Sequence, residues 1–420
     1  MLNRIAKVLK KSNIARQMYR IYKGIDFSYL ILQITPIIVK NTKFDFERIN
    51  LLVPSINKEH FYGGVSTAFK IFDEIIKKAN KHTKARIILT DARPNKEAIA
   101  EFSKYQLVSF DDDTDAKYQL LPVNNKYQKN IFVTENDKFI ATAWWTAYSS
   151  QEIIRQQLKL YNQDYHKLVY IIQDFEPGFY NWSSHFVLAE STYRSEIPTI
   201  AVFNSSLLKS FFNAREYKFL KEYYFEPQMN EKLKQHIDFK PIRKKKQILI
   251  YGRPSVDRNS FSLIIEALRI IVYKKPDIHE WVFYSAGESH SDIALGNGVA
   301  LQSMGKLSLD DYARILKESA IGISLMISPH PSYPPLEMAH FGVLTITNSF
   351  ANKDLSKWHQ NIISIDILAP ETLCNTLSRV IEKYNNNCNI GWEGKSSTKY
   401  VNNETNFGFI DNLMNDMQNI

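Results

Sequence analysis

Short apolar runs alternate along the chain with stretches in which apolar residues recur at helical spacing. The first run, residues 49–53, predicts a strand, and a helical stripe at residues 65–76 follows it after Gly63 and Gly64. Further runs predict strands at 86–89, 130–134, 168–172 and 199–203, with helical patterns near 151–160 and 205–212 between them. Such alternation predicts a largely parallel sheet.

The same alternation begins again after residue 246. Between 221 and 246 the pattern gives way to charges and prolines, which is typical of a linker. We therefore predict an α/β protein with two doubly wound domains in series. The expected parts are a basic segment (1–45), a first α/β domain (46–220), a linker (221–246), a second α/β domain (247–395) and a tail (396–420), whose return to the first domain the sequence leaves open.

Length and composition agree with this division, because 420 residues are more than a typical single core accommodates. The chain has only two cysteines, Cys374 and Cys388, so we expect no disulfide framework, as in a reducing cytoplasm. The apolar residues at the start are too few and too often interrupted by charge for a signal peptide or a membrane span. We expect a cytoplasmic protein.

The first residues are unusually basic. Seven cations precede the first acid, Asp26: Arg4, Lys7, Lys10, Lys11, Arg16, Arg20 and Lys23. Apolar residues recur among them at roughly helical spacing. This pattern favours peripheral association with an anionic membrane surface, and a solvated basic helix is the alternative. No recognition motif follows, so nucleic-acid binding is disfavoured.

Three residues of the C-terminal half suit a nucleotide sugar. Arg253 and Lys306 offer cations for a diphosphate and for the charge of a departing nucleotide, and Glu337 offers a carboxylate for ribose hydroxyls. Arg253 and the segment that contains Glu337 follow predicted strands, where ligands of open parallel sheets bind. Taken singly, each has a plainer reading: an Arg253–Asp257 pair, a solvated Lys306, and a Glu337 favoured by a helix dipole.

Asp174 and Glu176 follow the predicted strand at 168–172 and are candidates to bind or deprotonate an acceptor hydroxyl. Capping of a helix that begins near residue 182 is the alternative for both. Trp144, Trp145 and Tyr180 are candidates to stack on an acceptor sugar, although aromatic residues at such positions more often belong to the core.

Asp111, Asp112, Asp113 and Asp115 form the one acidic cluster that suggests a metal. The cluster lies in a polar stretch with no histidine or glutamate nearby, and the C-terminal half already supplies cations for phosphate. We therefore predict neither a metal nor a cofactor. The histidines show neither metal-ligand nor triad spacing.

Four motifs together resemble a known family: Gly63-Gly64-Val65, the segment 173–180, the segment 251–254 and the segment 330–335. With the segment 323–342 they resemble GT-B retaining glycosyltransferases, and more narrowly bacterial rhamnosyltransferases of the WsaF type. The resemblance spans roughly residues 48 to 395. It implies two Rossmann-like domains facing across a cleft, the first (46–220) on the acceptor side and the second (247–395) binding the nucleotide sugar. It also implies a dTDP-β-L-rhamnose donor, a lipid-linked surface glycan as acceptor and retention of configuration.

The resemblance also implies roles for individual residues. Arg253 and Lys306 would hold the diphosphate, and Glu337 would hold the ribose. Gly63 and Gly64 would let a loop approach the sugar phosphate. The residues at the start of the helix that carries Glu337 would lie beside the phosphates: Ser332, Tyr333, Pro334, Pro335 and Leu336. Many retaining relatives carry a glutamate eight positions before the one that matches Glu337, and this chain has Pro329 there.

Two classes of function follow from these patterns. The first is a metal-independent hexosyltransferase that uses Asp174, Glu176, Arg253 and Lys306 in catalysis. The second is a non-catalytic protein of glycan assembly that binds sugar nucleotides or serves as a membrane scaffold, which the basic N-terminus and Pro329 keep open. Donor turnover distinguishes the two.

Overall fold

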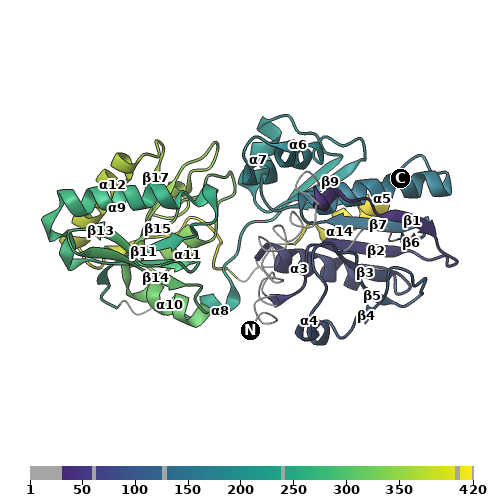
Figure 1. Ribbon diagram of the computed structural model, residues 1–420, viewed down its shortest axis with the longest axis horizontal. Helices are drawn as coiled ribbons and strands as arrows, with labels where there is room; N and C mark the ends of the chain where they lie inside the picture. The colour runs from purple at the N-terminus through teal and green to yellow at the C-terminus, as the bar shows by residue number, and fades with distance from the viewer. Residues whose placement is uncertain (1–30, 59–62, 125–129, 238–241, 403–406, 419–420) are drawn as a thin grey trace, which may run out of the picture. The chain divides into compact units, whose positions relative to one another are not determined.

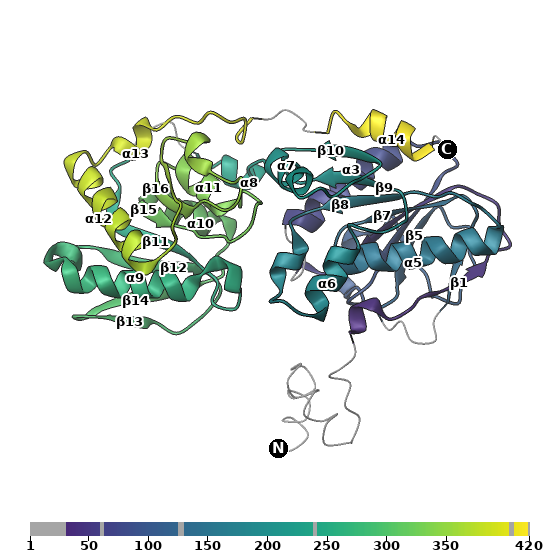
Figure 2. The same ribbon diagram turned by 90° about the horizontal axis from the view of Figure 1, so that it is seen from above.

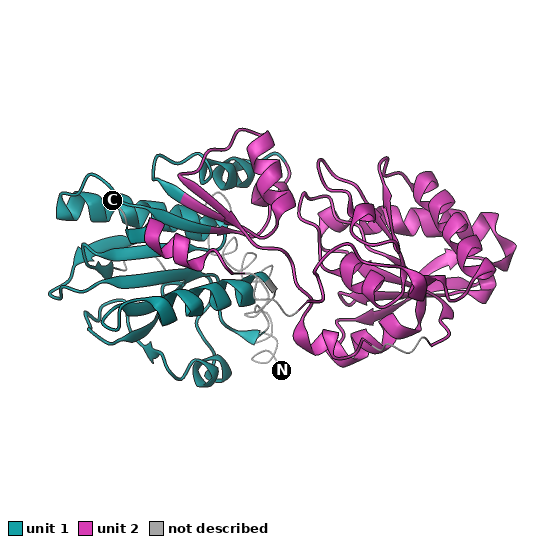
Figure 3. Cartoon of the chain, turned by 180° about the vertical axis from the view of Figure 1, so that it is seen from behind, with its two compact units in different colours: residues 1–170, 182–199, 417–420 teal, residues 171–181, 200–416 magenta. Residues whose placement is uncertain are grey.

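The computed structural model describes residues 31–58, 63–124, 130–237, 242–402 and 407–418. The chain divides into two compact units, which are coloured separately in Figure 3. The first unit comprises residues 1–170, 182–199 and 417–420, and the second comprises 171–181 and 200–416. The predicted basic segment falls mostly on residues 1–30, which lie outside the described residues.

The first sheet has eight strands in the order β10-β9-β8-β7-β2-β3-β5-β4. Figure 1 labels most of its strands, and Figure 2 labels β8 and β10. β2 and β8 are buried along their whole length, and the pairings among β3, β2, β7 and β8 are parallel, as the apolar runs predict. The strands are β2 (Arg48–Val53), β3 (Lys84–Leu89), β4 (Gln106–Leu107), β5 (Tyr118–Pro122), β7 (Asp137–Ala141), β8 (Leu168–Ile172), β9 (Thr199–Phe203) and β10 (Lys221–Tyr224).

Helices and one small ribbon accompany this sheet. β1 (Ile38–Asn41) and β6 (Asn130–Val133) pair in parallel as a separate two-stranded sheet. The helices are α3 (Gly63–Lys78), α4 (Lys96–Glu101), α5 (Trp144–Tyr161), α6 (Ser184–Ser191) and α7 (Ser206–Ala214).

The second sheet has seven strands in the order β13-β14-β12-β11-β15-β16-β17 and is parallel except for β13. Its strands are β11 (Lys245–Gly252), β12 (Val282–Gly287), β13 (Ile293–Gly296), β14 (Val299–Gly305), β15 (Ser319–Ile323), β16 (Leu344–Asn348) and β17 (Ile362–Ile365). The helices of this region are α8 (Glu231–Lys234), α9 (Phe261–Lys274), α10 (Leu309–Glu318), α11 (Pro334–His340), α12 (Pro370–Asn386) and α13 (Ile390–Glu393).

Both faces of the second sheet are covered, and β11 shows why. Ile248 and Ile250 pack into a core with residues of α9 and α12, whereas Leu249 packs into a second core with residues of α10 and α11. Successive strand side chains point to opposite faces, so a strand buried on both faces is a continuous apolar run. The predicted α/β class with two largely parallel sheets is confirmed.

The predicted linker is not structureless. Lys221–Tyr224 forms β10, which pairs in parallel with β9 at the edge of the first sheet, and Glu231–Lys234 forms α8. Charged and polar side chains suit an exposed edge strand, so an apolar run was not needed to form it. The region between the two sheets therefore begins after Tyr224 and ends where β11 begins.

The C-terminal helix α14 (Ile410–Gln418) lies beside β10 (Figure 2). The Tyr223 hydroxyl donates to Asp416 Oδ2 at 2.6 Å, and the rings of Tyr223 and Phe409 stack with centroids 5.5 Å apart. Phe225 and Phe407 add an edge-on contact at 5.7 Å. The tail thus returns to a strand of the first sheet. No helix among the described residues is long and apolar enough to cross a membrane.

Candidate functional site

The predicted donor residues follow strands of the second sheet. Arg253 comes directly after β11, and Lys306 comes directly after β14. Both strands run parallel to β12, so their carboxyl ends lie at the same edge of the sheet. Glu337 lies on α11, which follows β15 at that edge, because β15 is also parallel to β11. This is the edge at which open parallel sheets bind ligands.

A glycine precedes each of the two candidate cations, Arg253 and Lys306, and shapes the backbone there. Gly305 has φ of +63°, and a Cβ there would lie 2.6 Å from Ser289 Oγ, so the turn into Lys306 needs glycine. A Cβ on Gly252 would lie 2.0 Å from Ser285 Oγ, so β11 and β12 approach closely just before Arg253. Lys306 itself is exposed.

Tyrosines surround the Glu337 carboxyl. Burial raises the pKa of Glu337 to about 7, and the nearby Tyr312 hydroxyl offsets part of that rise. The charge of Glu337 in turn raises the pKa values of Tyr251, Tyr333 and Tyr400, although burial is the larger cause for each. An ionised Glu337 accepts hydrogen bonds from a diol, and a protonated one donates a hydrogen bond. The carboxyl is therefore poised between two states near neutral pH.

Arg253 borders the same cluster. Its guanidinium lies beside the Tyr251 hydroxyl and lowers the pKa of that group, against the larger effect of burial. The Arg253 Cγ lies 3.2 Å from the position that a Cβ on Gly287 would occupy. Arg253 and Glu337 thus flank Tyr251, and the structure brings together two of the three predicted donor residues.

The first turn of α11 supplies fewer backbone donors than a helix N-terminus ordinarily offers. Pro334 and Pro335 have no N–H, and the N–H of Glu337 donates to the Tyr333 carbonyl at 2.9 Å. Ser332 is buried at φ of +68°, and its N–H donates to His330 Nδ1 at 3.0 Å. This turn therefore offers few free backbone N–H groups to an anion.

Asp174 is held by partners that sequence reasoning missed. It is only 6% exposed, its Oδ2 accepts from Arg258, and its Oδ1 accepts from the Ser328 hydroxyl and from the Phe175 N–H. Arg258 also lies over the Phe179 ring, with the guanidinium carbon 4.0 Å from the centroid. These hydrogen bonds engage both oxygens of the Asp174 carboxylate.

Glu176 is buried in the 3-10 helix η3 (Glu176–Phe179). Neither acid caps α6, because the Ser183 hydroxyl accepts from the Phe186 N–H and serves that purpose. The roles proposed for Asp174 and Glu176 toward an acceptor stay predictions.

Two buried polar side chains, those of His330 and Lys353, make contacts with the loop before α11 or within it. His330 Nε2 lies 3.2 Å from Asn204 Nδ2, and Lys353 Nζ donates to the Met326 carbonyl at 2.6 Å. Burial lowers the pKa of His330 to about 4 and that of Lys353 to about 7, and in both cases the Asp174 charge opposes the fall. His330 is therefore neutral at pH 7, which suits its buried position.

The aromatic candidates differ in accessibility. Trp144 is fully buried against Trp145 and His185, so its prediction as an acceptor platform is wrong, because a buried ring offers no face to a sugar. Trp145 is partly exposed and donates through Nε1 to Asp91 at 2.9 Å, and Tyr180 is also partly exposed. Both stay predictions.

Two further predicted features lie in the first unit. Gly63 and Gly64 open α3, which follows β2 along the chain. In the acidic cluster, Asp113 accepts from the Thr42 hydroxyl at 2.5 Å and from the Lys43 N–H at 3.0 Å, while Asp112 accepts from the Ser109 N–H at 2.9 Å. Hydrogen bonds from other residues of the first unit thus engage these two carboxylates.

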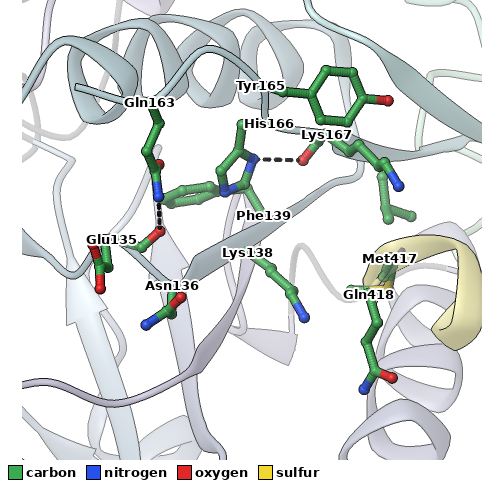
Figure 4. Close-up of a pocket in the computed structure, with 11 residues that line it drawn as sticks. Glu135, Asn136, Lys138, Phe139, Gln163, Tyr165, His166, Lys167, Met417 and Gln418 are labelled. Atoms are coloured by element: carbon green, nitrogen blue, oxygen red, sulfur yellow. Dashed lines mark hydrogen bonds between the residues drawn. The ribbon is translucent and has the colours of Figure 1, made fainter. Parts of the chain in front are cut away.

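A pocket of about 220 Å³ in the first unit lies where β7 and β8 begin (Figure 4). It is therefore at the opposite edge of the first sheet from the carboxyl ends of these strands. His166 lines it, with Nε2 2.8 Å from the Asp137 carbonyl and Nδ1 3.0 Å from the Lys167 carbonyl. Met417 and Gln418 of the tail complete the lining.

Comparisons with known proteins identify a family for most of the chain. The sequence model of the WsaF N-terminal domain matches residues 48–206, and that of the WsaF C-terminal domain matches residues 246–378. The O-antigen biosynthesis protein RfbC of Myxococcus xanthus is 26% identical over 287 residues, which are 67% of this chain and 21% of that protein. The chain thus spans about a fifth of that relative's length.

Solved structures confirm the GT-B fold with two Rossmann-like domains. A trehalose-phosphate synthase from Burkholderia vietnamiensis superimposes with a TM-score of 0.55 at 9% identity, covering 90% of this chain and all of that one. HepE of Anabaena, solved in complex with UDP, gives a TM-score of 0.51 at 11% identity, covering 82% of this chain and 93% of that one.

Proposed function

The chain belongs to the WsaF family, and we propose that it is a glycosyltransferase that transfers a sugar from a nucleotide donor to a growing bacterial surface polysaccharide. The relative RfbC is described as an O-antigen biosynthesis protein, which supports a surface glycan as the product. We further propose dTDP-β-L-rhamnose as the donor, a lipid-linked glycan as the acceptor, transfer with retention of configuration, and no metal requirement. The place of action is the cytoplasm, with peripheral attachment to the inner face of the membrane through the basic N-terminus.

The observation that carries this proposal is the meeting of Arg253 and Glu337 around Tyr251 at the carboxyl edge of the second sheet. A nucleoside diphosphate presents two anionic phosphates and a ribose or deoxyribose with free hydroxyls. A guanidinium and a carboxylate on one cluster match these two parts in charge and in hydrogen-bonding capacity.

In the proposed mechanism, negative charge develops on the diphosphate as the bond to the sugar breaks. Arg253 and Lys306 stabilise that charge from fixed positions after β11 and β14. Glu337 orients the nucleotide through a ribose or deoxyribose hydroxyl. The acceptor hydroxyl attacks the anomeric carbon and loses its proton, and Asp174 or Glu176 binds or deprotonates this hydroxyl.

The direct test is thermal-shift binding with a panel of nucleotide sugars and free nucleoside diphosphates in the absence of metal. dTDP and dTDP-rhamnose should raise the melting temperature of the wild-type protein, and Arg253→Ala should abolish the rise. Arg269→Ala is the matched control, because Arg269 is an exposed arginine that pairs with Glu266 three residues away. Preference for another nucleotide would refute the donor, and loss of the shift in Arg269→Ala would refute the site.

The alternative function is a non-catalytic sugar-nucleotide-binding or scaffold protein of glycan assembly. Two observations favour it: Pro329 stands where many retaining relatives have a glutamate, and the Asp174 carboxylate is engaged by Arg258 and Ser328. Such a protein would bind the donor without consuming it. Measuring release of nucleoside diphosphate with an acceptor present separates the two functions.

A further inference from the structure

The most exposed aromatic ring described in this protein is Trp182, which precedes α6. This residue is 94% exposed, whereas a tryptophan of a globular domain is ordinarily well buried. Its indole ring is parallel to the Phe186 ring, with an interplanar angle of 2° and centroids 5.7 Å apart. The flat ring pair is therefore accessible to solvent and to a ligand.

The scaffold beneath the pair is ordered. The Ser183 hydroxyl caps α6 by accepting from the Phe186 N–H at 3.3 Å, which fixes the backbone between the two rings. α6 packs on α5, and His185 lies edge-on to the fully buried Trp144. Stacking on a residue of a capped helix restricts the rotamers of Trp182. The side chain therefore loses less conformational entropy when a ligand binds to its ring.

The segment of sequence that carries the pair has no formally charged side chain, and the nearest one along the chain, Glu190, pairs with Arg194 at 3.3 Å. Residues 177–189 contain no aspartate, glutamate, lysine or arginine, although 23% of the whole chain is charged. Asn181, Ser183 and Ser184 are exposed and supply neutral hydrogen-bonding groups beside the ring. An anionic lipid surface or a nucleic acid would be met by cations. A neutral aromatic platform flanked by amide and hydroxyl groups matches an uncharged pyranose, which has apolar C–H faces and hydroxyl edges.

We propose that Trp182, supported by Phe186, is a platform for a neutral sugar ring of the acceptor glycan. The proposal rests on the proposed function and adds a binding residue to it. Trp182 follows by two positions the segment 173–180, which carries the acid candidates for the acceptor, so the chain leads directly from one to the other. Val187 adds an exposed apolar surface on the same helix.

The test measures direct binding of neutral trisaccharides of rhamnose, mannose, glucose and galactose to the full chain, by saturation-transfer NMR and calorimetric titration. Trp182→Ala should weaken binding of the best trisaccharide by about fivefold to tenfold, as expected for loss of one aromatic stacking contact. Trp182→Phe should restore part of the affinity. Tyr273→Ala is the matched control, since Tyr273 is 84% exposed on α9 and its loss should change nothing.

Unchanged affinity in Trp182→Ala, or a wild-type protein that binds none of the four sugars, would overturn the proposal. So would loss of sedimentation with phosphatidylglycerol vesicles in Trp182→Ala while sugar binding stays intact, because this would make the pair a membrane contact. The donor thermal shift is measured in parallel and should be the same in Trp182→Ala and wild type. Its absence from the wild type would refute the proposed function separately from the platform.

Discussion

Replacing Arg258 by alanine should destabilise the protein strongly, because it leaves the Asp174 carboxylate without its cation in a buried position. The side chains of Arg258 and Asp174 are 24% and 9% exposed, and the pair is charge-assisted. Breaking a buried pair by removing one partner costs about 3 to 5 kcal/mol. The Ser328 hydroxyl and the Phe175 N–H still solvate Asp174, so we expect the lower end of that range, about 3 kcal/mol.

Scanning calorimetry should therefore show a melting temperature lower by about 6 °C or more in Arg258→Ala. In the double variant Asp174→Asn with Arg258→Ala, much of the loss should be recovered, since a neutral amide does not need the cation. Arg269→Ala should change stability by less than about 0.5 kcal/mol, because Arg269 and Glu266 form an exposed pair. If Arg258→Ala costs no more than Arg269→Ala, the reasoning about the buried pair is refuted.

Other predictions follow from the donor cluster. Donor affinity should rise between about pH 6 and pH 8 and then level off, because Glu337, with its pKa raised to about 7, accepts a hydrogen bond from a sugar hydroxyl of the nucleotide once Glu337 is ionised. Titration calorimetry at several pH values should show this rise, and Glu337→Gln should remove it. The stability of the free protein should depend on pH in the opposite direction. Because the pKa of Glu337 is raised in the folded state, its contribution to the free energy of unfolding falls as pH rises from 4.5 through 7. Urea unfolding of the wild type and of Glu337→Gln at pH 5 and pH 8 measures this difference. Gly305→Ala should weaken donor binding through strain at φ of +63° and a clash with Ser289; unchanged affinity would mean that the turn does not position Lys306.

Much of the fold could be predicted because the central strands are continuous apolar runs. β2, β8 and β9 are buried along their whole length, and the helices between them carry apolar stripes. The apolar runs of the strands and the helical spacing of apolar residues are therefore both visible in the sequence. β10 could not be recognised this way. Its Lys-Glu-Tyr-Tyr sequence is that of an exposed edge strand, and only its pairing with β9 defines it.

The candidate donor residues could be selected from the sequence because the features that point to them are local: a cation directly after a strand and a carboxylate in the first turn of a helix. The partners of Asp174 were not, since Arg258 and Ser328 lie 84 and 154 residues away along the chain. The missing N–H groups of Pro334 and Pro335, in contrast, were visible in the sequence.

The burial of Trp144 was also visible in the sequence. Trp144, Ala147, Gln151 and Ile154 recur at helical spacing, and all four are buried on the inner face of α5. Trp145 is one position away from this stripe and is partly exposed.

The central claim is catalysis of sugar transfer through the Arg253 cluster, and the most direct measurement follows radiolabelled rhamnose from dTDP-β-L-rhamnose to a synthetic lipid-linked oligosaccharide. The wild-type protein should form labelled glycan and release an equal amount of dTDP without added metal. Arg253→Ala should lower the initial rate by about a hundredfold or more, as for loss of one group that stabilises developing negative charge, while Arg269→Ala keeps the wild-type rate. Binding of the donor with no release of dTDP in the presence of the acceptor would contradict the claim and favour the non-catalytic function.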